Sequence, residues 1–377
     1  MRELTPFFVM EILARAKELE CLGRDVIHLE IGEPDFPTPA PVIAAATEFL
    51  RAGRVAYTPA IGLPSLREAI AAHYLERYGI DIPPHRIVVT PGASGGFLIA
   101  LGLILAPGRR LLLSDPGYPC YGNLVTLFGG NSRLIPVEAE TRFHLSVDAV
   151  LHHWDADTVG TIVASPANPT GTVIDPPMFE SLITAVIDRG GHFISDEIYH
   201  GLQYGTSSPS ALNFSDQAFV VNSFSKYFGL TGWRIGWVIV PESFARAAET
   251  VAQNLFISAA TPSQHAALAA LGPECRTELE GRRQEFQARR DYLVGAVRAL
   301  GFGIQAVPEG AFYVYADASA HTDDSFEFAR RLLEDQAVAV TPGKDFGRYR
   351  HERYVRFAYT TSIPRMAEAI ERIRRSL

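Results

Sequence analysis

Short apolar runs that end in turn residues recur through the first two thirds of the chain, and helix-like segments separate them. The runs are residues 87–92 (IVVTPG), 111–119 (LLLSDPGYP), 161–171 (TIVASPANPTG), 192–199 (HFISDEIY), 219–226 (FVVNSFSK) and 235–240 (IGWVIV). Strands buried on both faces form near-continuous apolar runs, and alternation with helices is typical of parallel sheets. The pattern predicts an α/β fold with a mainly parallel sheet and helices on both faces.

The last quarter of the chain has a different pattern. A long charged helical stretch leads into an apolar strand, GAFYVYAD, and then into a helix, further short strands and a final helix. This order is typical of a smaller α+β domain. We therefore expect a large domain of residues 36–275, a small domain of residues 276–377, and an N-terminal segment of residues 1–35 that packs with the small domain.

Charge and cysteine content exclude several classes of protein. With 34 basic and 42 acidic residues the net charge is −8, which argues against affinity for nucleic acid or for anionic membranes. The longest apolar run, residues 97–106, is too short to span a bilayer and predicts a buried helix. Three widely spaced cysteines without a CxxC pair argue against a zinc site, and with no apolar signal core at the N-terminus they indicate a cytoplasmic protein. We expect no metal.

Polar residues cluster directly after the apolar runs. In open α/β sheets the ligand crevice lies at the carboxyl ends of the strands. We therefore expect Ser94, Tyr118, Asn168, Asp196 and Lys226 to converge, although more than a hundred residues separate the first from the last.

Lys226 is the residue with the most specific chemistry. It lies between two apolar runs, Ser223 and Ser225 precede it, and Arg234 follows. Hydroxyl groups and a guanidinium suit a dianionic phosphate, so the hypothesis is a lysine that forms a Schiff base with a phosphorylated aldehyde cofactor. Taken alone, a loop lysine is more often a solvated surface charge.

Two other segments also allow both a functional and a purely structural interpretation. The glycines of TPGASGGF (residues 90–97) stand at a helix start, where backbone N–H groups favour phosphate, but such a turn more often serves packing. Asp196 ends an apolar strand, where a carboxylate needs a partner; a protonated pyridine nitrogen is one, and a helix cap or structural ion pair is the other interpretation.

Taken together, eight segments resemble the class I/II pyridoxal-phosphate-dependent aminotransferases of fold type I, the superfamily of aspartate aminotransferase. They are GEPDFPTP (32–39), AYTPAIGLPSLREAI (56–70), TPGAS (90–94), DPGYPCY (115–121), SPANPTG (165–171), SDEIY (195–199), SFSKYFGLTGWRIG (223–236) and YVRFAY (354–359). They occur in the family's order and at compatible spacings. The resemblance implies a sheet of the seven-stranded type in a large domain that binds pyridoxal 5'-phosphate.

The resemblance also implies roles for individual residues. Lys226 corresponds to the Schiff-base lysine, Asp196 to the carboxylate on the pyridine nitrogen, and Tyr199 and Asn168 to partners of the ring's phenolic oxygen. Tyr118 would stack on the ring. The implied phosphate ligands are Ala93, Ser94, Ser223, Ser225 and Arg234, together with Tyr57 from the neighbouring subunit of a homodimer. Arg356 and the backbone of Gly32 would bind the substrate α-carboxylate.

The implied roles agree with the chemistry of the side chains, although single residues have other interpretations. A guanidinium on a strand can grip a carboxylate at two points. Arg356 alone would more often form a surface salt bridge, Tyr118 a core aromatic contact and Asn168 a turn.

The resemblance implies amino-group transfer from an L-amino acid to a 2-oxo acid by a ping-pong mechanism, with Lys226 as the proton shuttle. The alternative is a carbon–sulfur lyase on the same scaffold, which would release pyruvate and ammonia without an acceptor. Ser94 stands where some relatives specific for dicarboxylates have lysine, and Phe7 and Phe8 stand where relatives line the entrance. These features predict a preference for apolar or aromatic amino acids.

Overall fold

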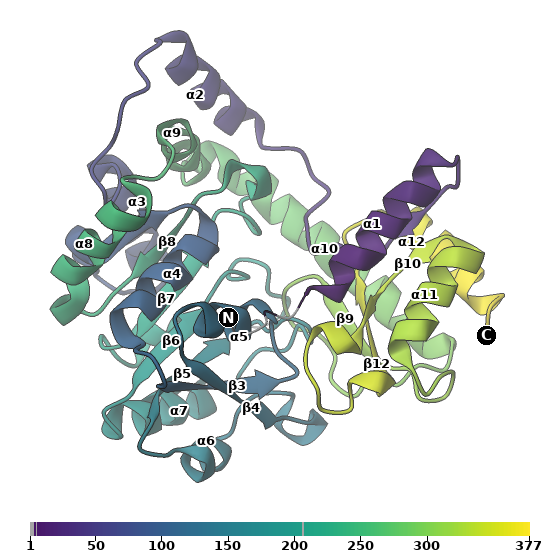
Figure 1. The fold of residues 1–377 in the computed structure, drawn as a ribbon. Helices are drawn as coiled ribbons and strands as arrows, with labels where there is room; N and C mark the ends of the chain where they lie inside the picture. Colours follow the sequence, from purple (N-terminus) through teal and green to yellow (C-terminus); the bar gives the residue numbers. More distant parts are fainter. Residues whose placement is uncertain (1–3, 5, 206) are drawn as a thin grey trace.

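The computed structural model describes residue 4 and residues 6–205 and 207–377, so the first residues of the predicted N-terminal segment lie outside the described part (Figure 1). Its helices are α1 (Phe8–Cys21), α2 (Ala40–Arg51), α3 (Pro64–Tyr78), α4 (Gly92–Ile104), α5 (Cys120–Leu127), α6 (Val147–His153), α7 (Pro176–Asp188), α8 (Ala245–Phe256), α9 (Thr261–Ala270), α10 (Pro273–Ala299), α11 (Ser325–Gln336) and α12 (Ile363–Arg374).

Within the part of the chain that the structure describes, the larger sheet has seven strands in the order β2-β8-β7-β6-β5-β3-β4. They are β2 (Ile87–Thr90), β3 (Arg110–Asp115), β4 (Asn131–Pro136), β5 (Thr158–Ala164), β6 (His192–Asp196), β7 (Phe219–Ser223) and β8 (Gly236–Ile239). β8 runs antiparallel to both neighbours, whereas the other pairings are parallel. Because β8 is reversed, its first residue lies at the edge where the parallel strands end.

Alternation along the strands builds two cores, one on each face of this sheet. Val220 of β7 packs into the core that includes α3 and α7, and its neighbour Val221 packs into the core that includes α4 and α8. Phe193 and Ile194 of β6 divide in the same way. Successive side chains of a strand point to opposite faces, so a continuous apolar run supplies both cores.

The C-terminal part forms a second layered unit around its own core. The described residues give it a three-stranded antiparallel sheet in the order β11-β12-β9, with β9 at Tyr313–Asp317, β11 at Thr341–Pro342 and β12 at Tyr354–Ala358. In addition, β1 (Ile27–His28) pairs in parallel with β10 (Val338–Ala339). The predicted fold class is confirmed: a mainly parallel sheet with helices on both faces and a smaller α+β unit.

Helix α1 lies against this smaller unit (Figure 1). Its buried residues Ile12, Ala16 and Leu19 recur at helical spacing and belong to the same core as β9 and β12. The chain between α1 and α2 then crosses to the large unit, where α2 packs on α9. Because α1 stays with the smaller unit, both ends of the chain contribute to that unit. An amphipathic helix of this kind is stabilised by the core it covers rather than by its own propensity.

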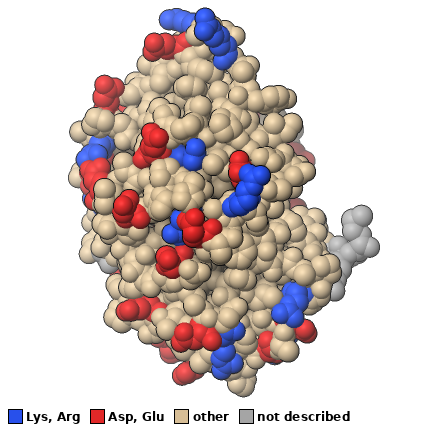
Figure 2. Space-filling model, turned by 90° about the vertical axis from the view of Figure 1, so that its left-hand side faces the viewer, with Lys and Arg blue, Asp and Glu red and all other residues tan. Residues whose placement is uncertain are grey.

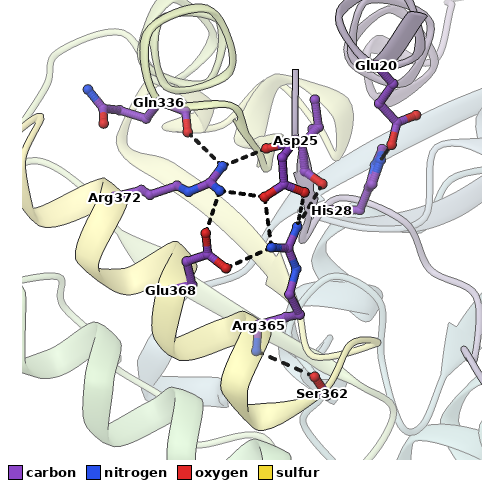
Figure 3. A network of polar contacts seen from close by, with 9 residues as sticks. Glu20, Asp25, His28, Gln336, Ser362, Arg365, Glu368 and Arg372 are labelled. Carbon is purple, nitrogen blue, oxygen red and sulfur yellow. Dashed lines mark hydrogen bonds and ion pairs between the residues drawn. The ribbon is translucent and has the colours of Figure 1, made fainter. Parts of the chain in front are cut away.

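An ionic network ties α12 to the chain just before β1 (Figure 3). Arg365 and Arg372 each donate to the Asp25 carboxylate at 2.7 Å, and Glu368 accepts hydrogen bonds from both arginines. The two arginines lower the pKa of Asp25 to about 2. The groups are largely exposed, so the network fixes the position of α12 more than it stabilises the fold.

The surface is mixed in charge. On the face drawn in Figure 2, acidic and basic side chains are interspersed rather than gathered by sign. Among the described residues, no helix combines the length and the apolar character needed to cross a bilayer. The same residues contain no group of three or more His, Cys, Asp or Glu side chains placed to hold a metal ion.

Candidate active site

A cavity of about 350 Å³ opens where the parallel strands end, between the large sheet and the smaller unit. It brings together the predicted residues Gly32, Ala93, Ser94, Tyr118, Asn168, Asp196, Tyr199, Ser225, Lys226, Arg234 and Arg356. Two predicted residues do not line it. Ser223 is buried beneath it, and Tyr57 is 81% exposed on the loop that follows α2.

Lys226 follows β7 and its side chain is withdrawn from water. Its Nζ atom donates a hydrogen bond of 2.6 Å to the carbonyl of Gly32, 194 residues earlier in the chain. Burial lowers the pKa of Lys226 to about 8, and the charge of Glu33 opposes this shift. A desolvated ammonium gives up its proton more readily than one in water, so Lys226 is suited to act as a nucleophile or a base.

Asp196 ends β6 as a buried carboxylate. The hydroxyl of Tyr121 donates a hydrogen bond to one oxygen, and the backbone N–H of Ile198 donates one to the other oxygen at 3.1 Å. Burial raises the pKa of Asp196 to about 6, and the charge of Lys226 has the smallest of the opposing effects. A buried carboxylate in this state gains from a cationic partner, which the protonated ring nitrogen of a pyridine would be.

The first turn of α4 forms an anion-binding end of the cavity. Gly92 has φ +70°, a left-handed conformation that favours glycine, and it lies against the Arg234 guanidinium. Ala93 and Ser94 follow in the first turn, whose N–H groups have no partner inside the helix. Helix N-terminal amides together with an arginine fit a phosphate group.

The hydroxyl groups before Lys226 have different surroundings. Ser225 lines the cavity, and its backbone N–H donates to Ser223 Oγ at 3.1 Å. Ser223 Oγ in turn lies 3.0 Å from the carbonyl of Ile235, to which it donates. The side chain of Ser223 therefore supports the loop from below, and its role in phosphate binding stays a prediction.

Arg356 of β12 lines the cavity from the side of the smaller unit. It is only 4% exposed, and its guanidinium donates to Asn168 Oδ1 at 2.8 Å and to the carbonyl of Glu30 at 2.6 Å. The ring centroids of Tyr313 and Phe346 lie 4.1 and 4.8 Å from its Cζ atom. Its Nε atom has no hydrogen-bond partner among the described residues. A guanidinium fixed in this way offers a planar site for a carboxylate.

The aromatic residues of the cavity include two that the sequence analysis did not single out. Tyr313 of β9 lies 3.0 Å from Tyr199, hydroxyl to hydroxyl, and its hydroxyl packs against Gly32. Tyr121 of α5 contacts Tyr118 edge-to-face at 5.3 Å in addition to its bond with Asp196. Tyr121 stands in the segment DPGYPCY, directly after predicted turn residues at the end of a strand, and this position could have indicated that it lies near the site. No pattern in the sequence around Tyr313 indicates that this residue lines the cavity.

One group of residues that line the cavity is apolar. It consists of Phe7 and of Val9, Met10 and Leu13 of α1. Phe8 points elsewhere: it packs edge-to-face on Phe326 at 5.7 Å.

A family model for "Aminotransferase class I and II" matches residues 24–373 of the chain. The chain belongs to this family. This aminotransferase is 40% identical over 370 residues to the valine–pyruvate aminotransferase of Mycobacterium tuberculosis, covering 98% of this chain and 95% of the relative. It is 38% identical to the (5-formylfuran-3-yl)methyl phosphate transaminase of Methanocaldococcus jannaschii, covering 98% and 96% of the two chains.

Solved structures of aminotransferases have the same fold. A crystal structure of an aminotransferase from Mycobacterium tuberculosis superposes with a TM-score of 0.95 at 40% identity, covering 99% of this chain and 97% of the other. The aspartate aminotransferase of Thermus thermophilus with maleate superposes with a TM-score of 0.94 at 33% identity, covering 99% and 97%. The protein is therefore an enzyme that transfers amino groups between amino acids and 2-oxo acids and depends on pyridoxal phosphate. The relatives do not favour the carbon–sulfur lyase.

The residues of the cavity fit this cofactor. The turn at Gly92, where φ is +70°, and the guanidinium of Arg234 would form a cradle for its phosphate. The buried carboxylate of Asp196 suits its ring nitrogen, and Lys226 supplies a primary amine with a lowered pKa for its aldehyde. The phosphate, the ring nitrogen and the aldehyde of the cofactor thus each have a chemical counterpart among these residues.

Proposed function

We propose that Lys226, Asp196 and Tyr199 are the catalytic residues of this aminotransferase, and that Arg356 with Asn168 and the backbone of Gly32 binds the substrate α-carboxylate. The observation that carries the proposal is the single cavity lined by a lysine with a lowered pKa, a buried carboxylate and a buried arginine. The same proposal assigns the phosphate to Ala93, Ser94, Ser223, Ser225 and Arg234, and the ring face to Tyr118.

When bound, pyridoxal phosphate supplies an aldehyde that carries the amino group and a ring that accepts electrons. Lys226 Nζ accepts the substrate α-proton, and its desolvated surroundings keep a larger fraction of the amine neutral than in water. Asp196 keeps a proton on the ring nitrogen by ion pairing. Arg356 fixes the α-carboxylate and thereby orients the Cα–H bond.

The amino donor is proposed to be an apolar or aromatic L-amino acid. The apolar lining by Phe7, Val9, Met10 and Leu13 supports this proposal, because an apolar wall favours apolar side chains and gives no charge partner to a second carboxylate. Ser94 supports it too, since it adds no cation beside the phosphate site. A relative named valine–pyruvate aminotransferase points in the same direction.

A panel of amino donors tests the substrate class. The purified holoenzyme is assayed with alanine, valine, leucine, phenylalanine and aspartate, each with pyruvate and with 2-oxoglutarate as acceptor. We expect higher kcat/KM for the apolar donors than for aspartate. Aspartate turnover much faster than that of the other donors would refute the proposed class while leaving amino-group transfer intact.

The proposal also includes a homodimer with shared sites, located in the cytoplasm. The exposed position of Tyr57, near the exposed side chains of Ile43, Leu50 and Val55, supports a contact made by a second copy. Tyr57 would then reach the phosphate of its neighbour. Unpaired cysteines at Cys21, Cys120 and Cys275 support a reducing compartment.

Hybrid dimers test the shared site. One subunit carries Lys226→Ala and the other carries Tyr57→Ala, so one of the two sites in the hybrid has both changes and the other site has neither. We expect the mixture, after dissociation and reassociation, to be more active than either homodimer alone. Activity equal to the average of the two homodimers, or a monomer by analytical ultracentrifugation, would contradict this arrangement.

A further inference from the structure

Asp345 lines the cavity but has no part in the proposed function. It ends a short 3-10 helix, Gly343–Asp345, in the loop between β11 and β12, and it is 6% exposed. Its Oδ1 atom accepts a hydrogen bond of 3.2 Å from the backbone N–H of Val9, 336 residues earlier in the chain. This oxygen accepts whether or not the carboxyl group is ionised. A buried side chain of the smaller unit is thereby bonded to the first turn of α1.

The start of α1 depends on a partner from outside the helix. The first N–H groups of a helix have no acceptor inside it, and the residue before the helix often supplies one. Phe7 precedes α1, and its side chain has no acceptor atom. The buried residues of α1 begin at Ile12, so the core packing that holds the later turns starts beyond the first one. Asp345 therefore supplies the bond that the residue before the helix cannot make.

The residues on either side of Asp345 contact two parts of the site. Lys344 Nζ lies 4.6 Å from the ring centroid of Phe8, the first residue of α1. On the other side, the ring centroid of Phe346 lies 4.8 Å from Arg356 Cζ. Three successive residues of one loop therefore contact either the start of α1 or the guanidinium that is proposed to bind the α-carboxylate. The loop fixes how these two parts lie relative to each other.

The loop itself is bonded to the large unit. The carbonyl of Phe346 accepts a hydrogen bond of 2.9 Å from the N–H of Gly117. The Asp115 carboxylate, at the end of β3, accepts one of 3.0 Å from the N–H of Arg348. Asp345 thus holds α1 from a segment whose position is set by the large sheet.

We propose that Asp345 is a positioning residue that determines donor specificity: its Oδ1 atom holds the first turn of α1, and with it the apolar lining of the cavity, against the side chain of the amino donor. The inference rests on the proposed function, in which Arg356 binds the α-carboxylate and the apolar lining receives the donor side chain. A long apolar side chain gains from that lining, because each methylene group in an apolar pocket adds to transition-state binding. Alanine, with a single methyl group, gains little from it.

Asp345→Ala and Asp345→Asn test the bond, because only the second variant keeps an oxygen that accepts from Val9. We measure kcat/KM of the holoenzyme with leucine and with alanine as donors. In Asp345→Ala the leucine-to-alanine ratio of kcat/KM should fall about 3- to 10-fold, the size of one lost hydrogen bond. In Asp345→Asn the ratio should stay within about twofold of the wild type. Loss of the carboxyl charge near Arg356 affects the α-carboxylate of both donors alike and cancels in the ratio.

Ser146→Ala is the matched control. Ser146 caps α6 through a hydrogen bond of 3.1 Å from the N–H of Ala149 to its Oγ atom, and it is not among the residues that line the cavity. The loss of a helix cap as such should leave the leucine-to-alanine ratio unchanged in this variant. A folded Asp345→Ala with the wild-type ratio, an equal fall in Asp345→Asn, or an equal fall in the control would overturn the positioning role.

Hydrogen exchange resolved to single residues tests the bond in the wild type. The N–H of Val9 should exchange more slowly than that of a free peptide, because Asp345 accepts its proton. Its exchange should be faster in Asp345→Ala and close to that of the wild type in Asp345→Asn. Exchange at the free-peptide rate in the wild type overturns the inference, even if Asp345→Ala does not fold.

The outcomes separate this inference from the proposed function. If the wild type turns over aspartate much faster than apolar donors, the proposed donor class fails. If Arg356→Lys leaves KM unchanged, the proposed carboxylate site fails. In either case the leucine-to-alanine ratio of the Asp345 variants and the exchange at Val9 still decide the role of Asp345.

Discussion

The guanidinium of Arg356 donates a hydrogen bond of 2.8 Å to the side-chain oxygen of Asn168, across 188 residues of sequence. Arg356 belongs to the small sheet and Asn168 to the loop after β5 of the large sheet, so the bond joins the two units inside the cavity. Both residues come from segments whose order resembles that of the family. The contact fixes the orientation of the buried guanidinium, which the proposed carboxylate site requires.

Replacing Arg356 by Lys should raise KM for every amino donor by about 10- to 100-fold, because an ammonium cannot grip a carboxylate at two points. The loss corresponds to about 1.5–3 kcal/mol, the range for a hydrogen bond to a charged group. Steady-state kinetics measure it. The matched control is Arg353→Lys, three residues away, whose guanidinium pairs with Asp317 near the surface. An equal rise in KM for the control would point to a general distortion of the small unit.

Lys226→Arg should lower kcat by at least about a hundredfold, because arginine neither reacts as an amine nor acts as a base near neutral pH. The chain contains three lysines, Lys17, Lys226 and Lys344, which makes the assignment unambiguous. Mass spectrometry of the borohydride-reduced holoenzyme should find the cofactor on the peptide with residue 226. Lys17→Arg, exposed on α1, is the control. A cofactor adduct on Lys17 or Lys344 would contradict the assignment.

The parts that could be predicted from sequence depend on local pattern. Burial of both faces of β6 and β7 follows from continuous apolar runs such as FVVN. Parallel strands end at one edge of the sheet, so the sequence predicts that Asn168, Asp196 and Lys226 converge. Tyr313 could not be found in this way, since its contact with Tyr199 depends on how the small unit docks on the large sheet. Roles toward the cofactor came from the family resemblance rather than from pattern.

The start of α1 shows a second limit of prediction from the sequence. Phe7 lines the cavity, but Phe8, one residue later, packs on Phe326. Phe7 is the extended residue before α1 and Phe8 is the first residue of the helix, so the point at which the helix begins decides which side chain reaches the site. Sequence alone predicts the existence of the helix better than its first residue.

Gly347→Ala should lower the free energy of unfolding by about 1–3 kcal/mol, the usual cost of overpacking. A Cβ atom there would lie 1.7 Å from the Asp115 carboxylate, which accepts hydrogen bonds from the N–H groups of Arg348 and Tyr349. These bonds tie the loop before β12 to the end of β3. Denaturant unfolding of the two proteins measures the difference.

The control for this change has the opposite expected sign. Gly295 is exposed in α10, and a Cβ atom there would meet nothing within 4 Å. Gly295→Ala should therefore stabilise the protein by about 0.4–1 kcal/mol, because alanine restricts the unfolded chain and favours a helix. A similar loss of stability in both variants would show that the contact with Asp115 is not the cause.

Tyr121→Phe should shift the acid limb of the kcat/KM profile to higher pH. The Tyr121 hydroxyl donates to Asp196 and lowers its pKa, which burial raises to about 6. Without the donor the pKa of Asp196 rises further, so a smaller fraction is ionised at a given acidic pH and less can pair with the ring nitrogen. One hydrogen bond is worth about 1 kcal/mol, so the shift should be somewhat less than one pH unit.

The control is Tyr118→Phe, which removes a hydroxyl of the same cavity that is not bonded to Asp196. This change should leave the acid limb of the profile in place. A limb that moves to lower pH in Tyr121→Phe, or that moves equally in both variants, would mean that a group other than Asp196 controls it.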